Sequence, residues 1–332
     1  MKKRDQIIYK SLVERASSAE IRGSIDQRKL PGAGSIDIDS YNKGLADCLS
    51  KKIKIITCLD SEYPSSLRHT PDYPAVLYCR GNTDLLNNDC LVAMVGSRRA
   101  TSYGLATAKR FSAKIATAGA VIVSGMALGI DSACHRGSLS VDGKTIAVLG
   151  TAIDNLYPKE NESLGRKIIT SGGCVISEYP PGFWTSKFNF PMRNRIIAGL
   201  SQATVVVEAA RNSGALITAG LALDYNRDLY AVPSDVDKLS SQGANLLLLQ
   251  GANCLISPSV IIDDLGLSSA LPTAKLTSQE KEVIEAIRAG ADNFDRITTK
   301  LNLAPSKLSV VLATLEIKGQ VKKCADRIQT FD

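Results

Sequence analysis

The sequence predicts an α/β protein with one doubly wound, mostly parallel sheet, and two observations support this fold class. From Cys90 onward, short runs of β-branched residues alternate with helical patterns, which is the βαβ rhythm of a parallel sheet. Most of these runs are continuously hydrophobic, as expected of strands that helices cover on both faces. The strand candidates are CLVAMVG, AVIVSG, KTIAVLG, CVISEY, ATVVVEA, DLYAVP and NCLIS. Helices are expected between them, at about 103–118, 131–139, 160–171, 195–200 and 215–225.

Two smaller units are expected to flank this sheet. The predicted boundaries are 1–50 for an N-terminal helical module, 51–266 for the core, 267–274 for a linker and 275–332 for a winged-helix domain. The last segment has three helical patterns followed by a hairpin pattern, which is the order of a winged helix. Its helix at 306–317 carries only Lys307 as a basic residue before its end. A role in packing or in binding a protein partner therefore fits this unit at least as well as recognition of duplex DNA.

Composition and charge favour a cytoplasmic protein with a mild preference for polyanions. Lys and Arg outnumber Asp and Glu by 40 to 33, a net charge of +7. No apolar run approaches the roughly 20 residues of a membrane span, and charges at Asp5 and Lys10 interrupt the place where an export signal needs an apolar stretch. The eight cysteines occur singly and only two histidines are present, so we expect reduced thiols and neither disulfides nor zinc ligation.

The end of the first predicted strand carries the residues of a phosphate-binding turn. Ligands of a doubly wound sheet bind beyond the carboxyl ends of its strands. Here Gly96, Ser97 and Arg98 precede a helix start, so backbone amides, a hydroxyl and a guanidinium meet there. The alternative is that Ser97 and Thr101 only cap the helix while the arginines are solvated.

The turn after the second strand, SGMALGID, would let a ligand approach the main chain at Ser124 and Gly125. A catalytic triad of Ser124, His135 and Asp131 could be drawn from it. The serine lacks a nucleophile-elbow context, however, and the other two residues better suit loop stabilisation. The GKT run at 143–145 precedes its strand, and no G-x-G-x-x-G follows the first strand, so neither a P-loop nor a dinucleotide cofactor is predicted.

The long loop after the fourth strand interleaves basic and aromatic residues. It contains Lys187, Arg193 and Arg195 among Phe183, Trp184, Phe188 and Phe190. Cations for the backbone and aromatic faces for unstacked bases are what single-stranded nucleic acid requires. The alternative is that the phenylalanines pack in the core and the arginines pair with Glu178 and Glu208. The ligand-contacting residues predicted from this and the other later loops are Lys159, Lys187, Arg193, Asn194, Arg195, Ser213 and Gly214.

Taken in order, these motifs resemble the DNA-processing protein A family over residues 55–262. The motifs that carry the resemblance include VGSRRATSYG, IVSGMALGIDSACHRGSL, ISEYPPG, FPMRNRIIAGLSQATVVVEAARNSGALITA and YAVPSDVD. The resemblance implies a Rossmann-like core that binds single-stranded DNA without a cofactor, forms a homodimer and loads a RecA-type recombinase in natural transformation. It assigns the grip on the strand to Arg98, Lys159 and Lys187, with Ser97 and the RNR group beside them.

Several features depart from the family or leave alternatives open. Ser234 and Ala152 stand where the family usually has glycine, and 183–186 replaces a stretch that typically bears proline. A nucleotide-processing enzyme of the lysine-decarboxylase-like phosphoribohydrolase type is the alternative function, but the corresponding stretch EAARNSGALITAG lacks the helix glutamate of such enzymes. The LPGAG turn at 30–34 resembles a helix-hairpin-helix turn, although an ordinary turn is the better interpretation. The leucines at 246–249 and 221–223 are interface candidates, but burial is the simpler expectation.

Overall fold

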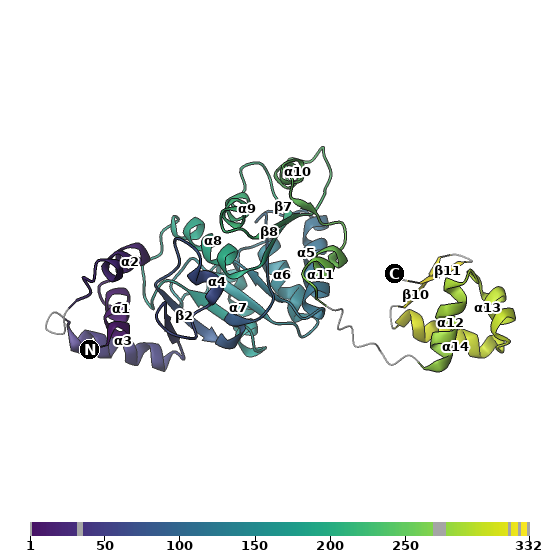
Figure 1. Cartoon of the computed structure of the whole chain (residues 1–332), viewed down its shortest axis with the longest axis horizontal. Helices are drawn as coiled ribbons and strands as arrows, with labels where there is room; N and C mark the ends of the chain where they lie inside the picture. Colours follow the sequence, from purple (N-terminus) through teal and green to yellow (C-terminus); the bar gives the residue numbers. More distant parts are fainter. Residues whose placement is uncertain (1, 32–35, 268–276, 318–319, 325–326, 331–332) are drawn as a thin grey trace. The chain divides into compact units, whose positions relative to one another are not determined.

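The structure of the chain is a computed structural model that describes residues 2–31, 36–267, 277–317, 320–324 and 327–330. The chain divides into two compact units, residues 1–269 and 270–332 (Figure 1). The first unit holds a nine-stranded sheet, and the second holds a two-stranded hairpin. Most of the predicted LPGAG turn and of the predicted linker lies outside the described residues.

All strands predicted from Cys90 onward are present and parallel to one another. The strands are β1 (Lys54–Thr57), β2 (Val76–Gly81), β3 (Leu91–Gly96), β4 (Val121–Ser124), β5 (Thr145–Leu149), β6 (Cys174–Ser177), β7 (Ala203–Glu208), β8 (Asp228–Ala231) and β9 (Asn253–Cys254). Their order in the sheet is β1-β2-β6-β5-β4-β3-β7-β8-β9. The sequence did not predict β1 and β2, and β2 runs antiparallel to both of its neighbours, so the sheet is mixed at that edge.

Helices cover both faces of the sheet, as the continuously apolar strands predicted. One set contains α5 (Ser102–Thr117), α6 (Ile130–Leu139), α7 (Glu162–Thr170) and α11 (Pro258–Asp264), and the other contains α8 (Asn189–Leu200), α9 (Gly214–Asp224) and α10 (Gln242–Leu249). Strand β3 shows the division, because Ala93 and Val95 belong to one buried cluster and Val92 and Met94 to another. Short helical turns lie at α4 (Ser65–Arg68), Thr83–Asn87 and Lys159–Asn161.

Helix α8 begins six residues earlier than the predicted helix at 195–200. Pro191 falls in its first turn, where backbone amides have no intrahelical acceptor. The missing N–H of proline therefore costs no hydrogen bond there, and its fixed φ suits the helix. The early start brings Phe190 and Asn194 onto the helix. Phe190 belongs to the predicted aromatic and basic loop, and Asn194 to the RNR group predicted to open the helix.

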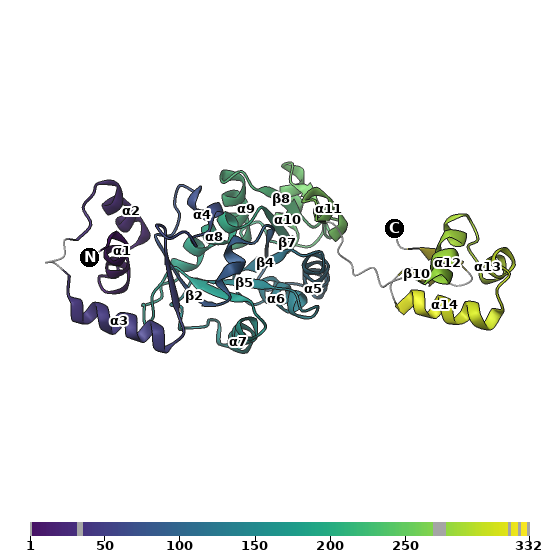
Figure 2. The same cartoon turned by 60° about the horizontal axis from the view of Figure 1, so that its bottom comes forward.

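The N-terminal helices α1 (Lys3–Leu12), α2 (Ser18–Asp26) and α3 (Ile38–Ser50) pack into the first unit (Figure 2). Ile7, Ile8 and Ile21 are buried in the same cluster as the side chains of β2. The predicted boundary at residue 50 is therefore not marked by separate cores, and it remains a prediction.

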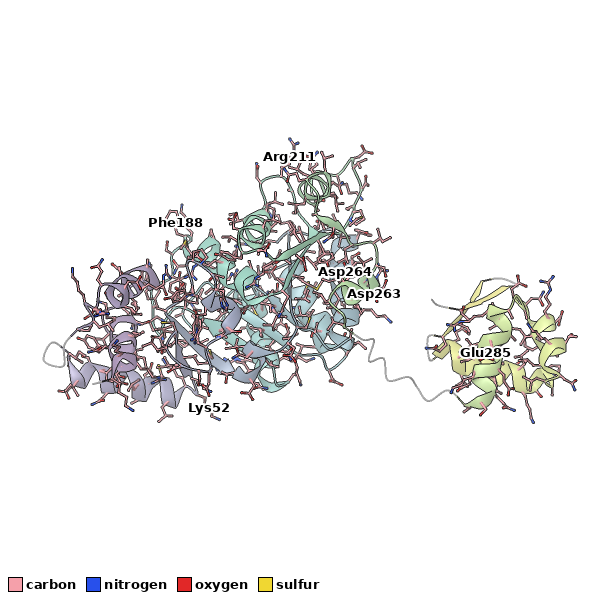
Figure 3. The ribbon with its side chains drawn as sticks, viewed as in Figure 1. Lys52, Phe188, Arg211, Asp263, Asp264 and Glu285 are labelled. Atoms are coloured by element: carbon pink, nitrogen blue, oxygen red, sulfur yellow. The ribbon has the colours of Figure 1, made fainter. Side chains whose placement is uncertain are left out.

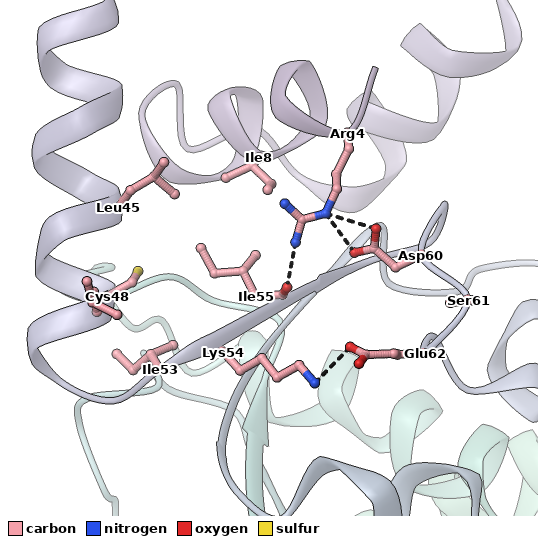
Figure 4. A pocket seen from close by; sticks show the side chains of 11 residues that line it. Arg4, Ile8, Leu45, Cys48, Ile53, Lys54, Ile55, Asp60, Ser61 and Glu62 are labelled. Atoms are coloured by element: carbon pink, nitrogen blue, oxygen red, sulfur yellow. Dashed lines mark hydrogen bonds and ion pairs between the residues drawn. The ribbon is translucent and has the colours of Figure 1, made fainter. Parts of the chain in front are cut away.

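Helix α1 also protects the outer edge of the sheet. Arg4 reaches from α1 to strand β1, where its Nη2 donates to the carbonyl oxygen of Ile55 and its Nε donates to Asp60 at 2.9 Å (Figure 4). Lys54 pairs with Glu62 at 2.8 Å beside it. An open strand edge is a template for unwanted pairing, so these contacts cap β1 and tie the N-terminal helices to the sheet.

The second unit has the predicted winged-helix order. It consists of α12 (Ser278–Arg288), α13 (Phe294–Leu301), α14 (Pro305–Ile317) and the hairpin of β10 (Val321–Cys324) with β11 (Arg327–Thr330). It has its own core, in which Val283, Ile297 and Leu308 are fully buried. Lys307 is exposed on α14, and it is the single basic residue of that helix.

Three expectations about chemistry concern the same described ranges. None of the helices there has the length and apolar character needed to cross a bilayer. No cluster of three or more His, Cys, Asp or Glu side chains is arranged to hold a metal ion within these ranges. The described cysteines are free thiols, and Cys254 is the exposed one among them.

Candidate nucleic-acid interface

A groove of about 640 Å³ lies at the point where the strand order reverses. Strand β3 continues through α5 toward β4, whereas its other neighbour β7 continues through α9 toward β8. The two connections leave opposite faces of the sheet and open a crevice between their loops, which is where doubly wound sheets bind ligands. The predicted site residues that line the groove are Gly96, Ser97, Arg98, Arg193, Asn194, Ser213 and Gly214. Residues on the lining that the prediction missed include Asn212, Thr218, Leu239 and Ser240.

The loop after β3 is held in place from the neighbouring strand. The amide of Ser97 donates to the carbonyl oxygen of Glu208 at 2.7 Å. The buried Glu208 carboxylate accepts hydrogen bonds from the Thr101 amide at 3.0 Å and the Thr101 hydroxyl at 2.5 Å. Thr101 in turn caps α5 through the Gly104 amide, whereas the Ser97 hydroxyl accepts from the Arg99 amide. The capping alternative is therefore correct for Thr101 and wrong for Ser97.

Arg98 projects from this fixed loop as an exposed cation. Its guanidinium carbon lies 5.7 Å from the ring centroid of Phe190, and the Tyr157 ring lies 5.6 Å from the same centroid. Two loops and the first turn of α8 thus meet in one cluster of a cation and two aromatic rings. Tyr157 is half exposed, and Lys159 follows it as another exposed cation.

A second cation and two exposed rings lie just before α8. The Lys187 ammonium lies 5.5 Å from the ring centroid of Phe188. Phe188 is 71% exposed and Trp184 is 88% exposed, so neither ring is part of the core. The Phe188 side chain lies at the outline of the molecule, as does Arg211 of the loop after β7 (Figure 3). The alternative that the phenylalanines pack in the core is wrong for Phe188.

Arg193 lines the groove as predicted, but the structure corrects its expected exposure, because the side chain is buried at the floor of the groove. Its Nη1 donates inward to the carbonyl oxygens of Gly125, at 2.5 Å, and Val148. Burial lowers its pKa to about 10, although the carboxylate of Asp131 favours its charged form. Arg193 therefore joins the ends of two strands under the groove, and it supplies charge there without projecting into solvent.

Arg195, Ser124 and Gly125 are also corrected, because all three are buried away from the groove lining. Arg195 is 5% exposed and its Nη2 donates to Glu178 at 2.5 Å, as the pairing alternative stated. The companion alternative for Glu208 is wrong, since that carboxylate binds Thr101.

The serine, histidine and aspartate of the discarded triad do not form a Ser-His-Asp relay, although a hydrogen bond from Ser124 acts on the Asp131 carboxylate and lowers its pKa against the larger effect of burial. The Ser124 hydroxyl donates to the carbonyl oxygen of Met94 at 2.6 Å. The His135 ring lies 2.7 Å from the Thr145 hydroxyl, and burial lowers its pKa to about 3. Asp131 accepts from the amide of Ala127, and burial raises its pKa. No proton path from Ser124 to His135 is formed by these contacts.

Known protein families match both units of the chain. Residues 54–266 match the model of the DNA recombination-mediator protein A family, and residues 268–327 match that of the DprA winged helix domain. Protein Smf of Escherichia coli is 40% identical over 207 residues, which cover 62% of this chain and 55% of that protein. The DNA processing protein DprA of Streptococcus pneumoniae is 41% identical over 207 residues, covering 62% of this chain and 72% of that protein.

Two solved structures are similar over most of the chain. The X-ray structure of the Streptococcus pneumoniae DprA covers 80% of this chain and 98% of its own, with a TM-score of 0.65 and 33% identity. A structure of Helicobacter pylori DNA processing protein A, described for its single-stranded DNA binding mode, covers 64% of this chain and 95% of its own, with a TM-score of 0.59 and 31% identity. The chain spans a little over half the length of the Escherichia coli protein and 58% of Protein Smf from Synechocystis.

Proposed function

Because the chain belongs to the DNA recombination-mediator protein A family, we propose that its groove and the adjoining loops bind single-stranded DNA. The observation that carries this proposal is the exposure of cations and aromatic rings on the loops around the groove, namely Arg98, Lys187, Phe188 and Trp184. Cations spaced over several loops suit a chain of phosphates, and exposed rings suit unstacked bases. The related Helicobacter pylori protein, whose structure is described for single-stranded DNA binding, supports the same conclusion.

The start of helix α9 supplies a second phosphate contact in this proposal. Ser213 caps the helix, and its hydroxyl accepts from the Ala215 amide at 3.3 Å. Both Ser213 and Gly214 line the groove opposite Arg98 and the loop after β3. A helix N-terminus presents backbone amides and the positive end of its dipole to an anion. A phosphate held here would leave the strand free to continue toward Lys187.

We further propose that the protein acts as a recombination mediator that protects incoming single-stranded DNA and loads a RecA-type recombinase in natural transformation. This role would place it in the cytoplasm, and we propose that it works as a homodimer. Leu249 is 84% exposed and Leu223 is 59% exposed, although the adjoining leucines at 246–248 are half-buried. Exposed leucines on α9 and α10 provide apolar surface for such a dimer.

Arg98→Ala and Lys187→Ala are each expected to weaken binding of a short oligothymidylate by about tenfold, because each removes a charge-assisted phosphate contact. Each should also reduce the salt dependence of binding. Fluorescence polarisation of a labelled oligothymidylate, titrated at several salt concentrations, measures both effects. Lys114→Ala is the matched control, since Lys114 is an exposed cation at the last turn of α5, away from the groove loops.

An equal loss of affinity in the Lys114→Ala variant would mean that the loss comes from the change in net charge and not from a specific contact. Unchanged affinity in both Arg98→Ala and Lys187→Ala would contradict the proposed site. The same titration with a duplex of equal length separates the two remaining DNA-binding hypotheses. Tighter binding of the duplex would favour a winged-helix regulator instead.

We propose that the protein is not an enzyme, in contrast to the phosphoribohydrolase alternative. The helix after β7 carries no glutamate, and Ser124 and His135 are committed to other partners. Purified protein incubated with a nucleoside monophosphate is expected to release no free base on chromatography. Steady release of free base at a rate that scales with protein concentration would contradict this part of the proposal.

A further inference from the structure

A second cavity, of about 270 Å³, lies between the N-terminal helices and the segment that follows β6. Its walls come from the end of α1, the start of α2, residues 178–183 and the first turns of α8. It shares no lining residue with the groove at the strand reversal. Nothing in the proposed function uses it.

Three arginines line this cavity, and one of them has a buried donor without an acceptor. Arg195 gives its Nη2 to Glu178, but its Nη1 is buried without a hydrogen-bond partner among the described residues. An unsatisfied buried donor on a charged group is costly. Arg15 donates one hydrogen bond, from Nη1 to the carbonyl oxygen of Pro181. Arg22 donates from Nη1 to the carbonyl oxygen of Tyr73.

The carboxylates that line the cavity are already engaged. Glu178 accepts from Arg195, and Asp72 accepts from the Tyr225 hydroxyl at 2.5 Å. Three guanidinium groups and two carboxylates line the cavity, so the charge of the lining is positive by one. This imbalance favours an anionic ligand.

The start of α2 adds backbone donors to the same wall. Ser17 caps the helix by accepting from the Glu20 amide, and the Glu20 carboxylate returns a contact to the Ser17 amide. Ser18 and Ala19, the first two helical residues, line the cavity, and their amides have no acceptor among the described residues. First-turn amides of a helix are orphan donors that a phosphate can satisfy.

The opposite wall is apolar and aromatic. The rings of Tyr179 and Phe183 stack at 4.8 Å between centroids, with an interplanar angle of 25°. Pro180 and Met192 extend this wall, and Met192 is half exposed although it is apolar. Drug-sized ligand sites measure roughly 300–1,000 Å³, and this cavity of about 270 Å³ lies just below that range, so it suits a small ligand.

We propose that this cavity binds a nucleotide, with its phosphate on Arg15, Arg195 and the α2 amides and its base against Phe183 and Met192. The anion-binding groups and the flat apolar wall face one cavity, which is the combination that a phosphate joined to an aromatic base requires. The nucleotide is either free or the 5′-terminal unit of a DNA strand. Both sources present the same chemistry.

Isothermal titration of thymidine 5′-monophosphate into the full chain tests this proposal. The wild type is expected to show saturable binding at one site, and Arg15→Gln to weaken it by about tenfold, because a charge-assisted hydrogen bond is lost. Lys29→Gln is the matched control, since Lys29 is an exposed cation of the same N-terminal region and does not line the cavity. Thymidine, which lacks the phosphate, is expected to bind at least tenfold more weakly.

Ala19→Leu provides an independent test that removes no charge. Ala19 is exposed on α2 and lines the cavity, so a larger side chain fills the space without disturbing the core. Absence of thymidine monophosphate binding in the wild type, or unchanged affinity in both Arg15→Gln and Ala19→Leu, overturns the proposal. Arg98→Ala should keep thymidine monophosphate binding while losing oligothymidylate affinity, so a failure of the groove assignment is distinguishable.

Oligothymidylates with and without a 5′-phosphate identify the source of the ligand. Competition with thymidine monophosphate by the phosphorylated strand alone identifies the strand end. If neither strand competes, the ligand is a free nucleotide. Equal competition by both strands would contradict recognition of a terminal phosphate.

Discussion

Replacing Gly129 with alanine is expected to lower both the stability of the first unit and its affinity for single-stranded DNA. Gly129 has φ +82° and ψ −128°, a conformation that essentially only glycine adopts. A Cβ there would overlap the carbonyl oxygen of Ser97 and lie 2.7 Å from that of Arg98. Backbone strain and the forced shift of this loop together are expected to cost about 2–4 kcal/mol.

The loss of DNA affinity follows because the loop that would move carries Arg98. The amide of Ile130, next to Gly129, donates to the Ser97 carbonyl oxygen at 3.1 Å and fixes that loop from below. Urea unfolding followed by circular dichroism measures the stability, and fluorescence polarisation at a temperature where the variant is folded measures the affinity. We expect Arg98→Ala to add little to the affinity loss of Gly129→Ala, since both changes remove the same contact.

Gly220→Ala is the matched control for this substitution. Gly220 is an exposed residue of α9, and a Cβ there meets no atom within 4 Å. Alanine in an exposed helix is more stable than glycine by roughly 0.5–1 kcal/mol. A similar loss in Gly220→Ala, or full stability in Gly129→Ala, would mean that the loop after β3 does not depend on Gly129.

The strands of the parallel region could be predicted because each is a continuous apolar run between turn residues. Strand β1 was not predicted, since two of its four residues, Lys54 and Thr57, are polar. Strand β2 has an apolar run at 76–79, but a sequence pattern does not show its antiparallel partner. The partner of β2 is β6, where Cys79 pairs with Ile176 almost a hundred residues away. Such pairing is decided by tertiary packing, which a local pattern does not encode.

The loops of the candidate site could be predicted from strand order, but the depth of each cation could not. Arg98 and Lys187 are exposed, whereas Arg193 and Arg195 are buried, and all four follow strands in the sequence. One signal was available for Arg193, because it shares a helix face with Ile197 and Leu200 at i+4 and i+7. The sequence predicts Arg193 at the opening of a helix and facing a ligand, whereas this spacing places it on the buried face of α8.

Replacing Glu178 with leucine is expected to cost about 3–5 kcal/mol of unfolding free energy, because the buried guanidinium of Arg195 loses its counter-charge. The side chains of the pair are 10% and 6% exposed, so water can replace little of the lost interaction. Urea unfolding measures this change. Glu178→Gln is expected to cost less, since its amide oxygen still accepts the hydrogen bond from Arg195.

The double variant Glu178→Leu with Arg195→Met separates the cost of an unpaired charge from the worth of the pair. A buried ion pair replaced by apolar residues of similar size is often neutral in stability, so we expect the double variant to regain most of the loss. A single variant within about 1 kcal/mol of the wild type would show that solvent reaches Arg195, because the unpaired charge would then cost little.

A bound nucleotide links this pair to the second cavity. If a phosphate binds Arg195 as proposed, thymidine monophosphate supplies the anion that Glu178→Leu removes. The nucleotide should then raise the midpoint of urea unfolding more in Glu178→Leu than in the wild type, since a ligand that binds only the folded state stabilises it more when it binds more tightly. An equal rise in both proteins would place the phosphate away from Arg195, on Arg15 and the start of α2.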